Sequence, residues 1–262
     1  MHKENHHSGI AVSLILAIML FLLVIPKGHA QSGNLNWVQP IEGIEVHPIF
    51  HASLELKTSG KSLLVDPSFD PSLVASLQNP DIILLTDIHG DHLDLKLLNK
   101  IEEKFGTKPI ICPKAVAEML PERLLSQVKV LDNGDTYEWE GFLIEAVPMY
   151  NLGDGADVFH PKGRGNGYVL IVGAKRIYIS GDTEATAEFR QLKNIDLAFV
   201  CMNLPYTMDV NQAAAGVLDF QPAVVIPYHY RGASGFADIE SFKKQVEGGG
   251  KNIKVELLNF YP

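Results

Sequence analysis

A run of acids and imidazoles follows directly on an apolar stretch in "IILLTDIHGDHLD". The run contains Asp87, His89, Asp91 and His92 within six residues. Imidazole nitrogens and carboxylate oxygens are ligands that zinc and the neighbouring first-row divalent ions take in proteins. A lone histidine is more often solvated, and a lone aspartate before a helix is more often its N-cap. Four such side chains together instead predict a metal site.

The segments on either side place this motif on a loop. Residues 81–87 favour a buried strand, and residues 93–105 carry apolar side chains at helical spacing. On a loop between them, alternate acidic and imidazole side chains can face one side, and His92 follows as the helix begins. We expect Gly90 to give the turn its conformational freedom.

The first half of the chain is rich in strand patterns. Residues 52–67 predict two strands around a turn at Ser59-Gly60. Further elements are expected downstream: a strand at residues 108–113, a short helix at residues 114–124, and strands around the turns Asn133-Gly134 and Glu140-Gly141.

The second half repeats this order of elements. A strand–turn–strand unit at residues 167–183 is followed by a buried strand at 195–203, a helix at 210–220 and a strand at 223–230. The segment "VEGGGKN" is interpreted as a loop before a last strand at residues 253–260. Two β-rich halves closed by helices predict an α+β fold in which sheet packs on sheet with helices outside.

The first thirty residues have the layout of a secretory signal peptide. A polar start is followed by an apolar run at residues 10–25 and by the small-residue signal Gly28-His29-Ala30. The alternative is an uncleaved membrane anchor, for which sixteen apolar residues are slightly short. We therefore expect a secreted or periplasmic protein with one large domain at residues 31–262, and membrane contact only if the segment is uncleaved.

Charge and cysteine content exclude two kinds of site. Of the 262 residues, residues 31–262 hold 20 basic and 30 acidic side chains, a net charge of −10, which argues against nucleic-acid binding. The only cysteines, Cys112 and Cys201, each end an apolar run, so we expect two unpaired core thiols. With no CxxC motif, a thiolate zinc site is excluded.

Four motifs in order resemble the metallo-β-lactamase superfamily of hydrolases. "DIHGDH" resembles its HxHxDH signature, with Asp87 in place of the first histidine. "HASLEL" with "KSLLVDP" resembles the opening hairpin, "YISGDT" the later Gly-Asp motif and "VVIPYHY" the final histidine motif. "VPMYN" and "FHPKGRGNGY" are similar to the ascorbate-6-phosphate lactonase-like branch, which is chemically diverse. The resemblance implies a four-layer αββα sandwich.

The resemblance also implies two neighbouring metal positions. The second position would use Asp91, His92 and His229, and Asp182 would bridge it to the first. The expected ion is zinc, with manganese or iron as the alternatives, and one or two ions would bind.

The first metal position would use Asp87, His89 and a ligand from a third motif. That ligand is usually a histidine at the end of a strand, but here the strand "IEAVPMYN" ends in Asn151. His160, nine residues later, is the candidate for this place, either as a ligand or as a substrate contact.

The ligand types predict hydrolysis by metal-activated water. A divalent ion lowers the pKa of bound water toward about 7 and polarises the oxygen under attack. Asp91 or Asp182 can orient the nucleophile and carry its proton to the leaving group. Thr86 and Thr183 are candidates to brace the ligand carboxylates, with ordinary strand-end hydrogen bonding as the alternative.

The remaining candidates concern the substrate, which we expect to be a small ester-type molecule, a lactone or a phosphoester. Lys162 and Arg164 in "HPKGRGNGY" could bind its anionic group, with a plain solvent loop as the alternative. Asn151 and His51 are further candidate contacts, and candidates for the pocket wall are Tyr150, Tyr206 and Tyr228. The alternative function is a metal-binding protein of the same fold without catalysis. The oligomeric state stays open.

Overall fold

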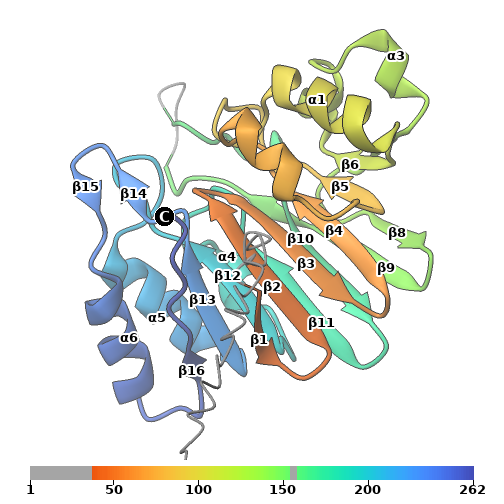
Figure 1. Cartoon of the computed structure of the whole chain (residues 1–262). Helices are drawn as coiled ribbons and strands as arrows, with labels where there is room; N and C mark the ends of the chain where they lie inside the picture. The colour runs from red at the N-terminus through yellow and green to blue at the C-terminus, as the bar shows by residue number, and fades with distance from the viewer. Residues whose placement is uncertain (1–36, 154–157) are drawn as a thin grey trace, which may run out of the picture. The chain divides into compact units, whose positions relative to one another are not determined.

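Two seven-stranded β-sheets form the centre of the structure, a computed structural model that describes residues 37–153 and 158–262 (Figure 1). The expected signal peptide at residues 1–30 lies outside the described residues. Within the described part, no helix has the length and apolar character needed to cross a membrane.

The first sheet begins antiparallel and continues parallel. Its strands follow chain order: β1 (Val38–Ile41), β2 (Ile44–Phe50), β3 (Ser53–Thr58), β4 (Lys61–Val65), β5 (Ile82–Leu84), β6 (Ile110–Cys112) and β7 (Val128–Val130). Strands β1 to β4 pair antiparallel, and β4 to β7 pair parallel. The predicted hairpin turn between β3 and β4 is confirmed, with Ser59 and Gly60 both at positive φ, as a tight hairpin requires.

The second sheet repeats this change from antiparallel to parallel pairing. In spatial order its strands are β16 (Lys254–Val255), β13 (Val224–Tyr228), β12 (Leu197–Cys201), β11 (Lys175–Ile179), β10 (Gly165–Val172), β9 (Phe142–Met149) and β8 (Thr136–Trp139). Strands β8 to β11 pair antiparallel, and β11, β12, β13 and β16 pair parallel. A short hairpin, β14 (Arg231–Gly232) and β15 (Gly235–Phe236), stands apart.

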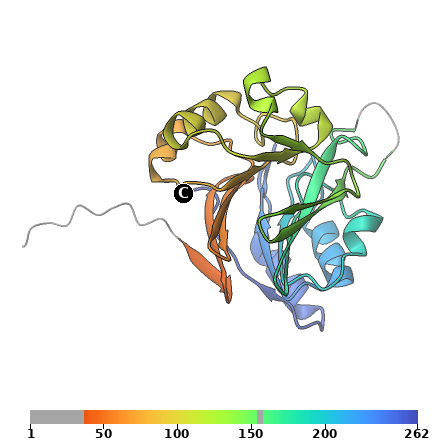
Figure 2. The same cartoon turned by 90° about the vertical axis from the view of Figure 1, so that its right-hand side faces the viewer.

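Helices cover the outer faces of both sheets (Figure 2). The first sheet carries η1 (Pro71–Ser76), α1 (Leu95–Phe105), α2 (Lys114–Ala117) and α3 (Glu122–Leu125). The second carries α4 (Ala187–Arg190), α5 (Val210–Phe220) and α6 (Ile239–Gly248). Two sheets of a mixed α/β fold are therefore present, as expected from the repeated strand pattern.

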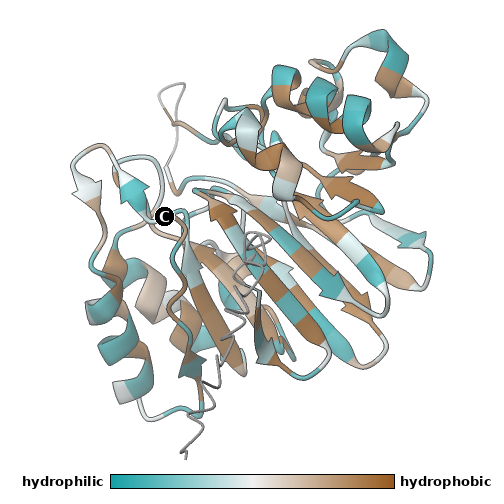
Figure 3. Cartoon of the chain, viewed as in Figure 1, coloured by the Kyte–Doolittle hydropathy of each residue, from teal (hydrophilic) through white to brown (hydrophobic). Residues whose placement is uncertain are grey.

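Alternating side chains along the strands build two separate cores. In β4, Leu63 packs into the core between the sheets, whereas Leu64 packs with α1 on the helix side. Ile82 and Ile83 of β5 divide in the same way. A parallel strand with both faces buried is apolar at nearly every position, as in β5, β6 and β12. In Figure 3 the strands carry brown bands, with teal bands between them on several strands.

Both cysteines lie in these cores as free thiols. Cys112 ends β6 and Cys201 ends β12, and each is buried. Burial raises the pKa of each thiol to about 12. The prediction of two unpaired core thiols is confirmed.

Three predictions of local structure were wrong. The expected helix at residues 114–124 is divided into α2 and α3 at Pro121, because proline has no N–H and disfavours helical backbone at the residue before it. The segment "VEGGGKN" was interpreted as a loop, but α6 continues to Gly248. Phe242 and Val246, one helical turn apart, are buried and hold this helix against the sheet. Only Lys254–Val255 of the expected last strand pairs with β13.

Candidate metal centre

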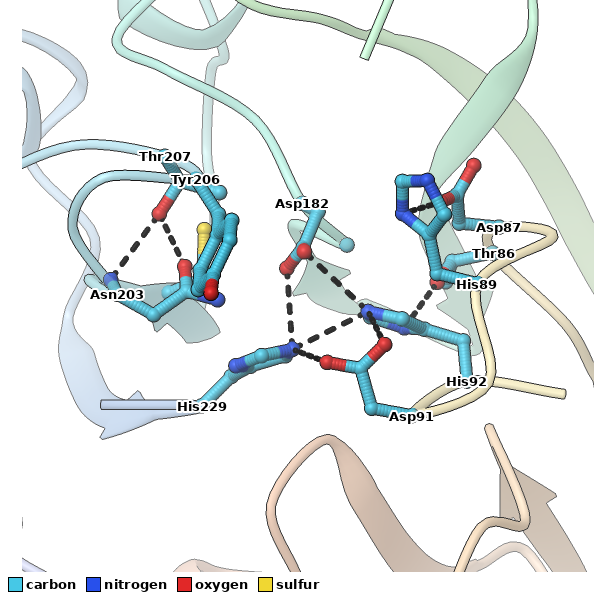
Figure 4. Close-up of polar contacts among 12 residues, drawn as sticks. Thr86, Asp87, His89, Asp91, His92, Asp182, Asn203, Tyr206, Thr207 and His229 are labelled. Carbon is cyan, nitrogen blue, oxygen red and sulfur yellow. Dashed lines mark hydrogen bonds and ion pairs between the residues drawn. The ribbon is translucent and has the colours of Figure 1, made fainter. Parts of the chain in front are cut away.

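The candidate ligands lie on loops that follow the carboxyl ends of strands in both sheets (Figure 4). Asp87 to His92 follow β5, Asp182 follows β11 and His229 follows β13. The turn does not need the conformational freedom expected of Gly90, which has no positive φ and where a side chain would meet open space. The turn is instead closed by a backbone hydrogen bond from His92 to His89 at 3.0 Å.

The second position brings donors of His92, Asp182 and His229 close together from distant parts of the chain, with Asp91 beside His229. His92 Nε2 lies 3.1 Å from His229 Nε2 and 3.4 Å from Asp182 Oδ2. His229 Nε2 lies 3.3 Å from Asp182 Oδ1 and 3.3 Å from Asp91 Oδ2. Donors placed tetrahedrally at about 2.0–2.2 Å from zinc lie about 3.3–3.6 Å apart. Asp182 Oδ1 is buried without a hydrogen-bond donor, so this position fits a cation.

The first position is formed by Asp87, His89 and His160. Asp87 Oδ2 lies 2.7 Å from His89 Nδ1 and 3.8 Å from His160 Nε2. His160 Nε2 also lies 3.3 Å from Asp182 Oδ2, and it is buried without a hydrogen-bond partner. These three side chains offer one donor atom each within 4.8 Å of one another, and Asp182 lies between the two positions.

Asn151 orients His160 instead of facing the metal positions. Its Oδ1 accepts a hydrogen bond from the His160 backbone N–H at 2.7 Å and lies 3.1 Å from His160 Nδ1. Its Nδ2 donates to Glu184 Oε1 and to the Tyr206 carbonyl. Both polar atoms of the Asn151 amide thus form hydrogen bonds within the protein, and His160 Nε2 points into the site.

His51 extends the site on the side of His229. Its ring lies 3.8 Å from the His229 ring, centroid to centroid, and its Nε2 lies 3.3 Å from Asp91 Oδ2. The His51 carbonyl accepts a hydrogen bond from the His229 N–H, and Nδ1 lies 2.6 Å from Tyr261 Oη. Burial lowers the pKa of His51 although Asp91 opposes this, which favours a neutral ring.

Sequence reasoning missed Asp66, which stands directly behind His92. Asp66 is fully buried at the end of β4, and its Oδ2 lies 2.9 Å from His92 Nδ1. Thr86 donates to it from both N–H, at 2.7 Å, and Oγ1, at 2.6 Å. Thr86 therefore braces Asp66 and His92, whereas Thr183 donates to the carbonyls of Tyr150 and Glu184. The signal for Asp66 was an acid directly after a buried strand in "LLVDP".

The charges of the site are strongly coupled. Burial alone would raise the pKa of Asp182, but His229 and His92 hold it well below its usual value. The pKa of Asp91 is likewise lowered, because contacts from His229 and His51 outweigh burial. The pKa of His92 is raised well above its usual value, since Asp182 and Asp66 outweigh burial. The carboxylates therefore attract positive charge to the centre of the site.

The two basic candidates of the glycine-rich segment are both paired with carboxylates. Lys162 Nζ lies 2.6 Å from Glu188 Oε1 and stacks over the Tyr150 ring. Arg164 binds Asp87 through Nε at 3.3 Å and Nη2 at 3.2 Å. Only Arg164 of the two contacts a candidate metal ligand.

A pocket of about 320 Å³ opens beside the two positions. It is lined by His89, Asp91, Phe159, His160, Asp182 and Tyr206. The rings of Phe159 and Tyr206 meet edge to face with centroids 5.0 Å apart. The loop that carries Tyr206 is closed by hydrogen bonds between Asn203 and Thr207 (Figure 4). Of the three tyrosine candidates only Tyr206 lines this pocket, since Tyr150 pairs with Glu188 and Tyr228 is buried.

Comparisons with known proteins find relatives that are named metal-dependent hydrolases. A family model described as a beta-lactamase superfamily domain matches residues 45–229. A UPF0173 metal-dependent hydrolase of Pyrococcus abyssi is 31% identical over 226 residues, which cover 82% of this chain and 96% of the relative. A crystal structure from Parabacteroides distasonis, of a protein proposed to be a metal-dependent hydrolase, is 38% identical with a TM-score of 0.71 and covers 82% of this chain and 92% of that one. A metallo hydrolase of Ignicoccus hospitalis, 22% identical with a TM-score of 0.70 and coverage of 84% and 96%, shows the same fold.

Proposed function

This chain belongs to the metallo-β-lactamase superfamily and to its UPF0173 metal-dependent hydrolases, and on that premise we propose that it cleaves an ester-type substrate with metal-activated water. The observation that carries this proposal is the convergence of His92, His229 and Asp182, whose donor atoms lie 3.1–3.4 Å apart. Imidazole and carboxylate donors at this spacing suit zinc, with manganese or iron as the alternatives.

The bound ion would supply two effects, a lower pKa for its water and polarisation of the carbonyl or phosphoryl oxygen. The chain's own residues divide the other tasks. Asp182 is held by three histidines and is almost fully buried, which suits a bridging ligand. The Asp91 side chain is 40% exposed and lines the pocket, which suits a carboxylate that accepts a proton and passes it to the leaving group.

The pocket wall favours a lactone or an acyl ester over a phosphoester. Phe159 is 44% exposed and Tyr206 is 36% exposed, so both rings are available to an apolar part of a substrate. Lys162 and Arg164, the basic candidates for an anionic group, are already paired with Glu188 and Asp87.

We also propose that residues 1–30 are a signal peptide and that the protein is secreted or periplasmic. The apolar run at residues 10–25 and the small residues before Gln31 support this. Amino-terminal sequencing of the exported protein tests it: the mature chain should begin at Gln31. A chain that keeps Met1 after export would contradict the proposal.

Hydrolysis assays test the proposed reaction. The purified protein should hydrolyse aryl esters and lactones faster than bis(p-nitrophenyl) phosphate, and a chelator should abolish turnover until zinc is restored. His92→Ala should abolish turnover as well. His47→Ala is the matched control, since His47 pairs with Glu55 outside the site. Bound metal without turnover of any substrate class would instead support the alternative, a metal-binding protein without catalysis.

A further inference from the structure

Arg164 is held next to the first metal position by the start of β10. The Asn166 N–H donates to the Thr86 carbonyl at 3.0 Å, which ties this strand to the residue before Asp87. Gly165 allows this close approach, because a Cβ there would lie 3.0 Å from the Thr86 carbonyl oxygen. The backbone therefore fixes where the Arg164 side chain starts, two residues before Asn166.

The guanidinium group of Arg164 contacts two candidate metal ligands, Asp87 and His89. Its Nη2 lies 3.2 Å from both carboxylate oxygens of Asp87, and Nε lies 3.3 Å from Oδ1. The same Nη2 lies 3.4 Å from His89 Nε2. The Asp87 side chain is fully buried and contacts both His89 Nδ1, at 2.7 Å, and Arg164 Nη2, at 3.2 Å. Of these two partners only arginine is always charged, so Arg164 competes with any ion at the first position for the charge of Asp87.

At the second metal position, no arginine or lysine of the described residues competes with an ion for the carboxylates. Within residues 37–153 and 158–262, no arginine or lysine forms an ion pair with Asp91 or Asp182. Asp66, behind His92, adds a further carboxylate to that side of the site. The second position therefore has more uncompensated negative charge than the first.

We propose that Arg164 makes the two metal positions unequal, so that the second fills at low zinc concentration and the first only when zinc is abundant. This inference rests on the metal centre of the proposed function. Arginine stays charged at every relevant pH, and like charges a few ångströms apart repel strongly in a partly buried site. Asp87 and Arg164 together carry no net charge, as would the neutral histidine that the superfamily signature has at this place.

Zinc titration of the full metal-free chain, by calorimetry and by competition with a chromophoric chelator, tests this directly. The wild-type protein should bind a first equivalent tightly and a second at least about tenfold more weakly. Arg164→Gln should tighten the second equivalent about tenfold or more and leave the first unchanged. Lys162→Gln is the control, because it removes a neighbouring positive charge that pairs with Glu188 and does not touch Asp87.

Two further variants keep the test decisive. Arg164→Lys keeps the charge and should keep the second equivalent weak. Arg164→Met keeps the aliphatic stem without the charge and replaces Arg164→Gln if that variant fails to fold. Two equivalents of equal affinity in the wild-type protein, or a second equivalent that Arg164→Gln and Arg164→Met leave unchanged or weaker, would overturn the inference alone. Absence of any zinc binding would overturn the metal centre and this inference with it.

Discussion

His92 Nε2 lies 3.1 Å from His229 Nε2, although 137 residues separate the two along the chain. Asp66 faces the other ring nitrogen of His92 at 2.9 Å, which holds the Nδ1–H tautomer and leaves a lone pair on Nε2. Two ring nitrogens that face each other in a buried site, with Asp182 beside both, would be stabilised by a shared cation. The pairing of these two histidines is the centre of the metal site.

Asp66→Asn should weaken zinc binding at the second position. Both Asp66 oxygens serve as acceptors, Oδ1 for the Thr86 N–H and Oδ2 for Thr86 Oγ1 and His92 Nδ1, whereas asparagine offers one oxygen and one NH2 donor and no charge. Such partners of a ligand typically contribute 10–100-fold, so we expect about that loss of affinity. Asp70→Asn is the control, because Asp70 is an exposed helix cap and asparagine caps as well. Equal zinc affinity of the Asp66→Asn and wild-type proteins in a chelator competition would show that Asp66 does not support the site.

Gly181→Ala should destabilise the fold and displace Asp182. Gly181 has a φ of 59°, and a Cβ there would lie 2.4 Å from Met149 Sδ. We expect the free energy of unfolding to fall by about 1–3 kcal/mol, measured with urea, and zinc affinity to fall with it. In Gly248→Ala, the control at the end of α6, the new Cβ meets open space, so stability should hold or rise by up to about 1 kcal/mol. Equal stabilities of the two variants would contradict this account.

Zinc affinity at the second position should rise with pH. Burial lowers the pKa of His92, but Asp182 and Asp66 raise it more, so a proton competes with the ion for Nε2 above the ordinary range of a histidine. Below that pKa, affinity should change by up to about tenfold per pH unit. A zinc dissociation constant that stays the same between about pH 6 and pH 8 would contradict this coupling.

The free energy of unfolding of the metal-free protein should instead fall as pH rises. Because the folded-state pKa of His92 is raised, its contribution to stability is fully present below the unfolded value of about 6.5. That contribution is lost as pH rises through the folded-state pKa. Urea unfolding of the chelator-treated protein as a function of pH measures it.

Phe159→Ala should act on substrate binding and leave the metal centre intact. Loss of this half-exposed ring should lower kcat/KM for an aryl ester about tenfold through a higher KM, while metal content stays at the wild-type value. An ester with only small alkyl groups should be affected little. Phe236→Ala on β15 is the control, since that ring is 62% exposed and does not line the pocket. An equal loss on both esters would show that Phe159 does not contact the substrate.

The sequence was most informative where chemistry is local. Asp87 to His92 lie within six residues after an apolar strand, so their types and spacing alone predicted the site. Asp182 and His229 were found because each ends a strand and matches a family motif. The two-sheet architecture followed from the repeated order of strand, turn and strand, which the pairing of β3 to β6 and of β10 to β13 reproduces.

Other parts of the site depend on tertiary contacts, which a local sequence pattern does not predict. The hydrogen bonds from Asn151 point His160 Nε2 inward, which favours His160 over Asn151 as the candidate ligand. Arg164 was a candidate substrate contact, with a plain solvent loop as the alternative, and in the structure it contacts Asp87, which lies 77 residues earlier in the chain. Asp66 is a single acid after a strand, and only its contact with His92 distinguishes it from an ordinary turn residue.

An anomalous difference map from zinc-loaded crystals tests the central claim most directly. We expect a peak between His92 Nε2, His229 Nε2 and Asp182, with bonds of about 2.0–2.2 Å and Asp91 on the same ion. A weaker peak beside Asp87, His89 and His160 should appear only at higher zinc concentration. No peak between His92 and His229 in crystals of the folded, zinc-saturated protein would contradict the account.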